Sequence, residues 1–204
     1  EMAMIPAGDR DIPAYVARPA ARGRFPVVIV VSEVFGIHEY IRDVCRRLAK
    51  LGYVAIATDF FARHGDPAPL TDFAAIRGIV AAATDAEVMN DINATVAWLS
   101  GQSFVDRKKM GITGFCWGGA AVWLACSRYR HFRCGVAWFG VTDPRYMFSV
   151  YWSDISSASK QYSMPSMIGD PKADANMLAA NAPIELASKI KAPVLLAYGG
   201  KDRR

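Results

Sequence analysis

Several classes of protein are excluded by what this sequence lacks. No uninterrupted apolar run approaches the ~20 residues that a membrane-spanning helix needs, so we expect no membrane partner. The four cysteines form no C-x-x-C pair and no histidine stands at zinc-finger spacing, which argues against a disulfide framework or a metal site. Lys and Arg outnumber Asp and Glu only by 24 to 19, and no aromatic residues interleave with the basic groups, so we expect no nucleic-acid partner. Nothing in the sequence implies a cofactor.

The composition is that of an ordinary globular chain. It has 204 residues, of which 52% are hydrophobic and 21% are charged, and it shows no internal repeat. This length predicts a single domain over residues 1–204 that can bury a core without a metal or a disulfide. The first residue is Glu1 and no leader pattern follows it. We therefore expect a cytoplasmic protein, or a periplasmic one if a leader has been removed, that is a monomer or a homodimer.

Strand-like and helix-like segments alternate along the chain. The expected strands are Met2–Pro6, Ile12–Arg18, Pro26–Val31, Tyr53–Thr58, Lys109–Thr113, Arg133–Phe139 and Val194–Tyr198; the expected helices are Glu39–Leu51, Asp85–Ser100 and Trp117–Arg128. The continuous β-branched runs are typical of strands buried on both faces. This alternation predicts an α/β fold with a mostly parallel central sheet and helices on both faces. Residues 142–181 follow no period and are rich in aromatics and Met, which favours a lid or a surface insertion.

One motif in the sequence indicates a catalytic nucleophile. The segment Gly114–Gly119, Gly-Phe-Cys-Trp-Gly-Gly, follows an expected strand and opens an expected helix, as a G-x-nucleophile-x-G elbow does. The sharp turn pushes the central Cys116 out of the end of the sheet, and the flanking positions must be small because they crowd each other. The helix N-terminus favours a thiolate and leaves the N–H of Trp117 available to an oxyanion. The alternative is a buried cysteine in a Gly-rich turn. For Cys45, Cys126 and Cys134 we expect core packing.

The sequence resembles the dienelactone hydrolase family, also called carboxymethylenebutenolidases, in the α/β-hydrolase superfamily. The resemblance rests on four phrases in order: Val31-Ser32-Glu33-Val34-Phe35-Gly36, Thr58-Asp59-Phe60-Phe61-Ala62-Arg63, Gly114-Phe115-Cys116-Trp117-Gly118-Gly119 and Tyr198-Gly199-Gly200-Lys201-Asp202. It extends from about Ile12 to Asp202, except through residues 142–181.

The resemblance implies roles for individual residues. Cys116 would be the nucleophile, Asp202 the acid that orients the triad histidine, and Glu33 a carboxylate beside Cys116 that takes part in activating it. The N–H groups of Trp117 and Val34 would form the oxyanion hole. Glu33, Cys116 and Asp202 each follow an expected strand, so all three should lie at the carboxyl edge of the sheet. The alternatives are a loop carboxylate for Glu33 and a turn residue for Asp202.

Five further residues are candidates for a place in the substrate pocket. Arg63 lies in a loop at the same edge and could contact a carboxylate on the substrate, although an exposed loop arginine fits equally well, as it does for Arg77. Phe35 belongs to the first of the shared phrases. Trp138 and Phe139 end an expected strand at this edge and could line the pocket, although core packing explains them equally well.

The order of catalytic groups raises a further expectation. In α/β-hydrolases the histidine follows the acid, whereas His38, His64 and His131 all precede Asp202. We therefore expect the native polypeptide to continue beyond Arg204 with the histidine and a closing helix. The activity implied is hydrolysis of a small lactone or ester by Cys116 through an acyl-enzyme. The alternatives are a non-catalytic binding protein of the same fold or a class I glutamine amidotransferase-type enzyme.

Overall fold

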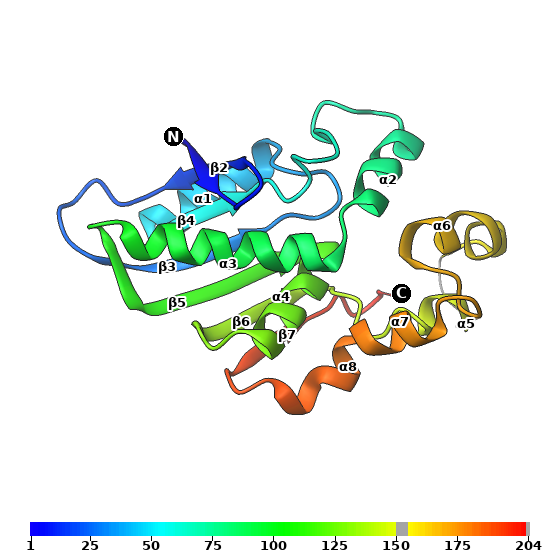
Figure 1. Ribbon diagram of the computed structural model, residues 1–204. Coiled ribbons are helices and arrows are strands. Elements are labelled where there is room, and N and C mark those ends of the chain that lie inside the picture. Colours follow the sequence, from blue (N-terminus) through cyan, green and yellow to red (C-terminus); the bar gives the residue numbers. More distant parts are fainter. Residues whose placement is uncertain (150–154, 203–204) are drawn as a thin grey trace.

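The computed structural model describes residues 1–149 and 155–202 and places one twisted sheet between layers of helices (Figure 1). The strands are β1 (Met2–Pro6), β2 (Asp11–Ala17), β3 (Phe25–Val31), β4 (Val54–Thr58), β5 (Val105–Phe115), β6 (Phe132–Trp138) and β7 (Val194–Ala197). In the described residues they are ordered β1-β2-β4-β3-β5-β6-β7. Strand β2 runs antiparallel to both of its neighbours, β1 and β4, and all other neighbouring strands are parallel. The predicted α/β class with a mostly parallel sheet is therefore confirmed.

The long helices lie on both faces of this sheet. They are α1 (Glu39–Lys50), α2 (Phe73–Ala82), α3 (Asp85–Gly101) and α4 (Trp117–Arg128). Helix α1 packs against β2, β3 and β4, whereas α3 and α4 cover the opposite face over β1, β5 and β6. Helix α3 begins with a capping box in which Thr84 and Glu87 satisfy each other's backbone N–H groups. Helix α2 was not among the expected helices; its Asp72 cap and its buried Ile76 and Val80 mark it as a short amphipathic helix.

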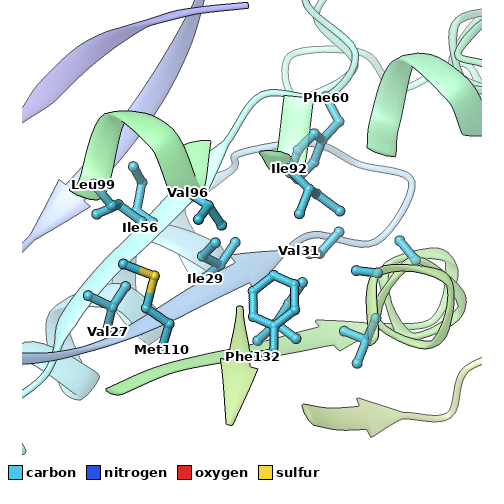
Figure 2. Packing of buried hydrophobic residues seen from close by; sticks show 14 of the residues in the cluster. Val27, Ile29, Val31, Ile56, Phe60, Ile92, Val96, Leu99, Met110 and Phe132 are labelled. Carbon is cyan, nitrogen blue, oxygen red and sulfur yellow. The ribbon is translucent and has the colours of Figure 1, made fainter. Parts of the chain in front are cut away.

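The main core lies between the sheet and helices α3 and α4. Val27, Ile29 and Val31 of β3 face Ile92 of α3, and Met110 of β5 packs beside them (Figure 2). On the other face, α1 contributes Ile41 and Cys45 to a smaller cluster with Val30, Ala55 and Ala57. Both faces of β3 and β4 are thus buried, which is why these strands are continuous apolar runs.

Strand β7 is largely exposed, and the core packing expected for Cys134 is wrong. Leu195 and Leu196 of β7 are 59% and 45% exposed, and Cys134 of β6 is exposed rather than packed in the core. A Cβ on Gly135 would meet Cys126 of α4, so Gly135 faces that helix and its neighbour Cys134 faces the opposite side. On that side α1 lies over β2–β4, at the far end of the sheet from β7.

Between β6 and β7 the chain forms short helical pieces. In the described residues these are α5 (Tyr146–Ser149), η1 (Ser159–Ser163), α6 (Met164–Ile168), α7 (Ala175–Asn181), α8 (Pro183–Leu186) and η2 (Ala187–Lys189). Helix α6 contacts α2, and α8 contacts α4 (Figure 1). Met164 and Leu178 are buried, whereas Tyr146 and Tyr162 are exposed. Residues 150–154 of the expected lid or insertion lie outside the described residues. None of the helices in 1–149 and 155–202 has the length and apolar character that crossing a bilayer requires.

Candidate active site

A cavity of about 660 Å³ opens between the carboxyl edge of the sheet and α1. Its walls bring together five of the residues that the sequence singled out: Glu33, Val34, Phe35, Cys116 and Trp138. The rest of the wall is mostly apolar and consists of Tyr40, Val44, Arg47, Leu48, Leu51, Phe115 and Phe139. This position outside the carboxyl ends of parallel strands is where α/β proteins bind their ligands.

Cys116 occupies a strained backbone position at the start of α4. Its φ of 54° and ψ of −111° lie where residues with a Cβ are rarely found. The turn is held because the N–H of Cys116 donates to the carbonyl of Trp138 on β6, at 2.9 Å. Cys116 is only partly buried and lines the cavity. A strained, accessible side chain at a helix N-terminus has the geometry that a nucleophile needs.

The glycines around Cys116 are required by close backbone contacts. A Cβ on Gly114 would lie 2.2 Å from the carbonyl oxygen of Gly118, and a Cβ on Gly118 would lie 2.4 Å from that of Ser32. The spacing argument from the sequence is therefore confirmed. It missed a second contact, in which a Cβ on Gly119 would lie 2.8 Å from the Cα of Gly140. That contact joins the start of α4 to the loop after β6, and nothing local in the sequence pairs these two glycines.

The two residues expected to form an oxyanion hole lie on either side of the elbow. Val34 follows β3 and lines the cavity. Trp117 is the first residue of α4, so its N–H has no acceptor inside its own helix. The Trp117 ring packs against Phe61, with centroids 4.9 Å apart, which anchors the helix start to the loop after β4.

Glu33 is not alone at the cavity wall. Its Oε1 contacts Nε2 of His38, and the two side chains are only 17% and 29% exposed. From the sequence, His38 was noted only as one of three histidines that precede Asp202. The pairing depends on the turn at Gly36, where φ is +69°, because this turn brings residue 38 back toward residue 33. The other two histidines lie elsewhere: His64 contacts Glu87 and His131 stacks on Tyr129.

Asp202 lies at the expected edge but is not among the described residues that line the cavity. It is exposed and follows β7, where its N–H donates to the carbonyl of Gly199 at 2.9 Å. Tyr198 donates from its hydroxyl to the carbonyl of Gly140 at 2.7 Å, which ties this loop to the elbow region. Burial first, and the charge of Asp202 second, raise the pKa of Tyr198, so the carboxylate lies near that ring.

Arg63 corrects the sequence expectation for substrate binding. Its guanidinium contacts Asp9 at 2.6 Å and the fully buried Asp91 at 2.5 Å, and its side chain is 12% exposed. It does not line the cavity. A buried carboxylate needs a paired cation, and Arg63 supplies it while joining the β1–β2 turn to α3. The Arg63 hydrogen bond holds the pKa of Asp9 at about 2.

The cavity wall also contains Phe139, which the sequence analysis named beside Trp138, and Phe115, which was not predicted to line the pocket. Phe139 has a φ of +40°, which is unusual for a bulky side chain, and its N–H donates to Ala197 at 2.7 Å. Phe115, next to the nucleophile, stacks on Trp138 with an interplanar angle of 16°. Phe115 directly precedes Cys116 in the Gly114–Gly119 segment, and this is the signal that could have identified it. Within 1–149 and 155–202 there is no group of three His, Cys, Asp or Glu side chains suited to a metal ion.

Comparison with known proteins agrees with this geometry. The sequence profile of the dienelactone hydrolase family matches residues 12–204. A relative from Methylorubrum extorquens, named for carboxymethylenebutenolidase, is 42% identical over 200 residues, which cover 98% of this chain and 59% of the relative. One from Salmonella typhimurium with the same name is 38% identical over 200 residues, covering 97% and 63%. The chain thus spans about three fifths of the length of these curated relatives.

A solved structure extends the likeness to three dimensions. The crystal structure of a protein from Klebsiella pneumoniae subsp. pneumoniae MGH 78578, described as a dienelactone hydrolase, matches with a TM-score of 0.70 and 29% identity. The match covers 100% of this chain and 86% of that one. With the family profile, the fold and the cysteine elbow in agreement, the chain belongs to the dienelactone hydrolase family of α/β-hydrolases.

Proposed function

We propose that the protein to which this chain belongs is a cysteine-dependent hydrolase of lactones or esters that acts through a covalent acyl-enzyme. The observation that carries the proposal is the strained placement of Cys116 at the N-terminus of α4, on the wall of an apolar cavity. The helix N-terminus and the partial exposure of the thiol both favour a reactive thiolate. Family membership supports an ester or lactone bond as the one attacked.

The proposed reaction proceeds in two steps. The Cys116 thiolate attacks the carbonyl carbon, forming a C–S bond while the carbonyl electrons move onto oxygen. The N–H groups of Trp117 and Val34 donate to this oxyanion. When the carbonyl re-forms, the C–O bond breaks, the leaving oxygen takes a proton, and a thioester remains until water hydrolyses it. Glu33 lies on the same cavity wall as Cys116, and Asp202 is proposed as the acid that orients a histidine base.

The cavity favours a small, largely apolar substrate. Phe35, Phe115 and Trp138 offer flat aromatic surface beside the nucleophile, and the volume of about 660 Å³ suits a small organic molecule. Arg47, on α1, is the basic residue among the described lining residues. No metal and no cofactor take part in the proposed chemistry.

The test is acylation and turnover of an activated ester by the full-length protein. With p-nitrophenyl acetate we expect release of p-nitrophenolate and an acetyl group on the Cys116 peptide. Cys116→Ala should abolish both, while Cys134→Ala, which removes the exposed thiol of β6, should leave both unchanged. Burial raises the pKa of Cys45 and of Cys126 to about 12, so neither should compete. A protein without the acyl adduct, or with turnover that survives Cys116→Ala, would contradict the proposal.

A further inference from the structure

His38 occupies the N-cap of α1 without using its side chain as a cap. Side chains at this position commonly accept a hydrogen bond from the first turn of the helix. Here the residue has an extended backbone, with φ −81° and ψ 178°, and makes no such bond. Its ring turns back across the Gly36 turn and places Nε2 against Oε1 of Glu33. An ionised carboxylate has only acceptors, so the histidine N–H is the donor in this contact.

Two aromatic side chains hold the ring in this direction. The His38 ring stacks on Tyr40, with centroids 6.3 Å apart and planes 18° apart. It meets Phe35 edge-on, with centroids 6.4 Å apart and an interplanar angle of 80°. Glu33, Phe35 and Tyr40 all line the cavity that contains Cys116. His38 is therefore packed directly behind the wall of the proposed active site.

The loop that carries Glu33 also touches the nucleophile elbow. A Cβ on Gly118 would lie 2.4 Å from the carbonyl oxygen of Ser32, so the residue before Glu33 is in backbone contact with the residue two after Cys116. Glu33 and Cys116 line the same cavity, and a carboxylate near a thiol opposes a second negative charge on that thiol. A hydrogen bond donated to that carboxylate stabilises its charge and draws it toward the donor.

We propose that His38 is a positioning residue that holds the Glu33 carboxylate by its ring N–H and thereby keeps Cys116 reactive. The inference rests on the proposed function, because it gives the Glu33–His38 pair a role only if Cys116 is the nucleophile. His38 itself does not line the cavity and acts through Glu33. The aromatic contacts with Phe35 and Tyr40 orient the ring for this purpose.

Two substitutions separate the hydrogen bond from the packing. His38→Phe keeps an aromatic ring between Phe35 and Tyr40 but has no N–H, whereas His38→Gln keeps an N–H near the position of Nε2 but has no ring. The readout is the rate at which iodoacetamide alkylates Cys116 in the full-length protein at fixed pH, followed by peptide mapping. We expect His38→Phe to slow alkylation about threefold to tenfold, since the pair is charge-assisted but partly exposed to solvent. His38→Gln should retain most of the wild-type rate.

A matched control and a double substitution complete the test. His64→Phe removes the other histidine–glutamate contact, His64 with Glu87 at 3.2 Å, and should leave the rate unchanged. Glu33→Gln should raise the rate, and adding His38→Phe to Glu33→Gln should change nothing further. If His38→Phe does not fold, the wild-type imidazole N–H resonance of His38 carries the test, because it should be shifted downfield and should lose that shift in Glu33→Gln.

The inference is overturned if Cys116 in His38→Phe is alkylated at the wild-type rate, or if the effect of His38→Phe persists in the Glu33→Gln background. It is also overturned if the N–H resonance of His38 does not shift in Glu33→Gln. Its failure is distinguishable from failure of the proposed function. Ester hydrolysis that survives Cys116→Ala refutes the function, whereas Cys116-dependent hydrolysis with unaffected His38 variants refutes only the role of His38.

Discussion

Replacing Cys116 by Ala and by Gly measures the strain stored in the nucleophile elbow. The two variants differ only in the Cβ, which at φ 54° and ψ −111° costs about 1–3 kcal/mol. Glycine avoids this cost but loses about 0.5–1 kcal/mol through the greater flexibility of its unfolded chain. Cys116→Gly should therefore be more stable than Cys116→Ala by about 0.5–2 kcal/mol. At a position with ordinary backbone geometry the sign would be reversed.

The assay is urea or thermal unfolding followed by circular dichroism, with about 2–4 °C in Tm for each kcal/mol in a chain of this size. Ala97, exposed in the middle of α3, provides the control, and Ala97→Gly should lower the free energy of unfolding by about 1 kcal/mol. Cys116→Ala should itself be no less stable than the wild type, because only a partly buried thiol is lost. If Cys116→Ala proves equal to or more stable than Cys116→Gly, the elbow stores no strain and the argument for it is wrong.

Three further outcomes follow from the packing and the charges. Gly118→Ala should lower the free energy of unfolding by more than about 3 kcal/mol or prevent folding, because its Cβ would lie 2.4 Å from a backbone oxygen. Gly78→Ala, which has open space around it in α2, should raise the free energy of unfolding by about 1 kcal/mol. Equal effects of the two substitutions in unfolding experiments would contradict the contact at Gly118. Arg63→Met should cost about 3–5 kcal/mol in urea unfolding by leaving the carboxylate of Asp91 buried without its cation, and a loss below 1 kcal/mol would refute the structural role. Burial raises the pKa of Asp59 to about 6, so the protonated carboxyl stabilises the fold most below pH 4, and this contribution is lost as the pH rises through 6. Asp59→Asn should be more stable than the wild type by about 1–3 kcal/mol at pH 8, and its free energy of unfolding should depend less on pH between 4 and 7. Parallel curves of stability against pH for the two proteins would contradict this.

The order of strands and helices could be predicted because each buried element carries a local pattern. Strand β3 is a β-branched run and helix α3 has apolar residues at helical spacing, so their identities need no tertiary information. The short helices between residues 142 and 181 could not be predicted in this way. Their few buried side chains, such as Met164 and Leu178, are chosen by contacts with distant elements rather than by a period.

Some residues of the candidate site could be predicted from local sequence features, and others could not. The elbow is a local feature that singles out Cys116 in the sequence, whereas Glu33 and Val34 were candidates through the family resemblance. The topology of a parallel sheet brings all three to one edge, where they line the same cavity. Arg63 could not be assigned, since its two partners Asp9 and Asp91 are separated from it by 54 and 28 positions.

The α/β class, the cysteine elbow and the need for glycine beside it follow from the amino-acid sequence, because they depend on periodicity and on sterics within a few residues. The fold was needed to show that Arg63 joins the β1–β2 turn to α3, that His38 contacts Glu33, and that Cys134 faces outward. Each of these depends on which side chain lies next to which across the fold. Such neighbours are set by packing between elements, which no local pattern records.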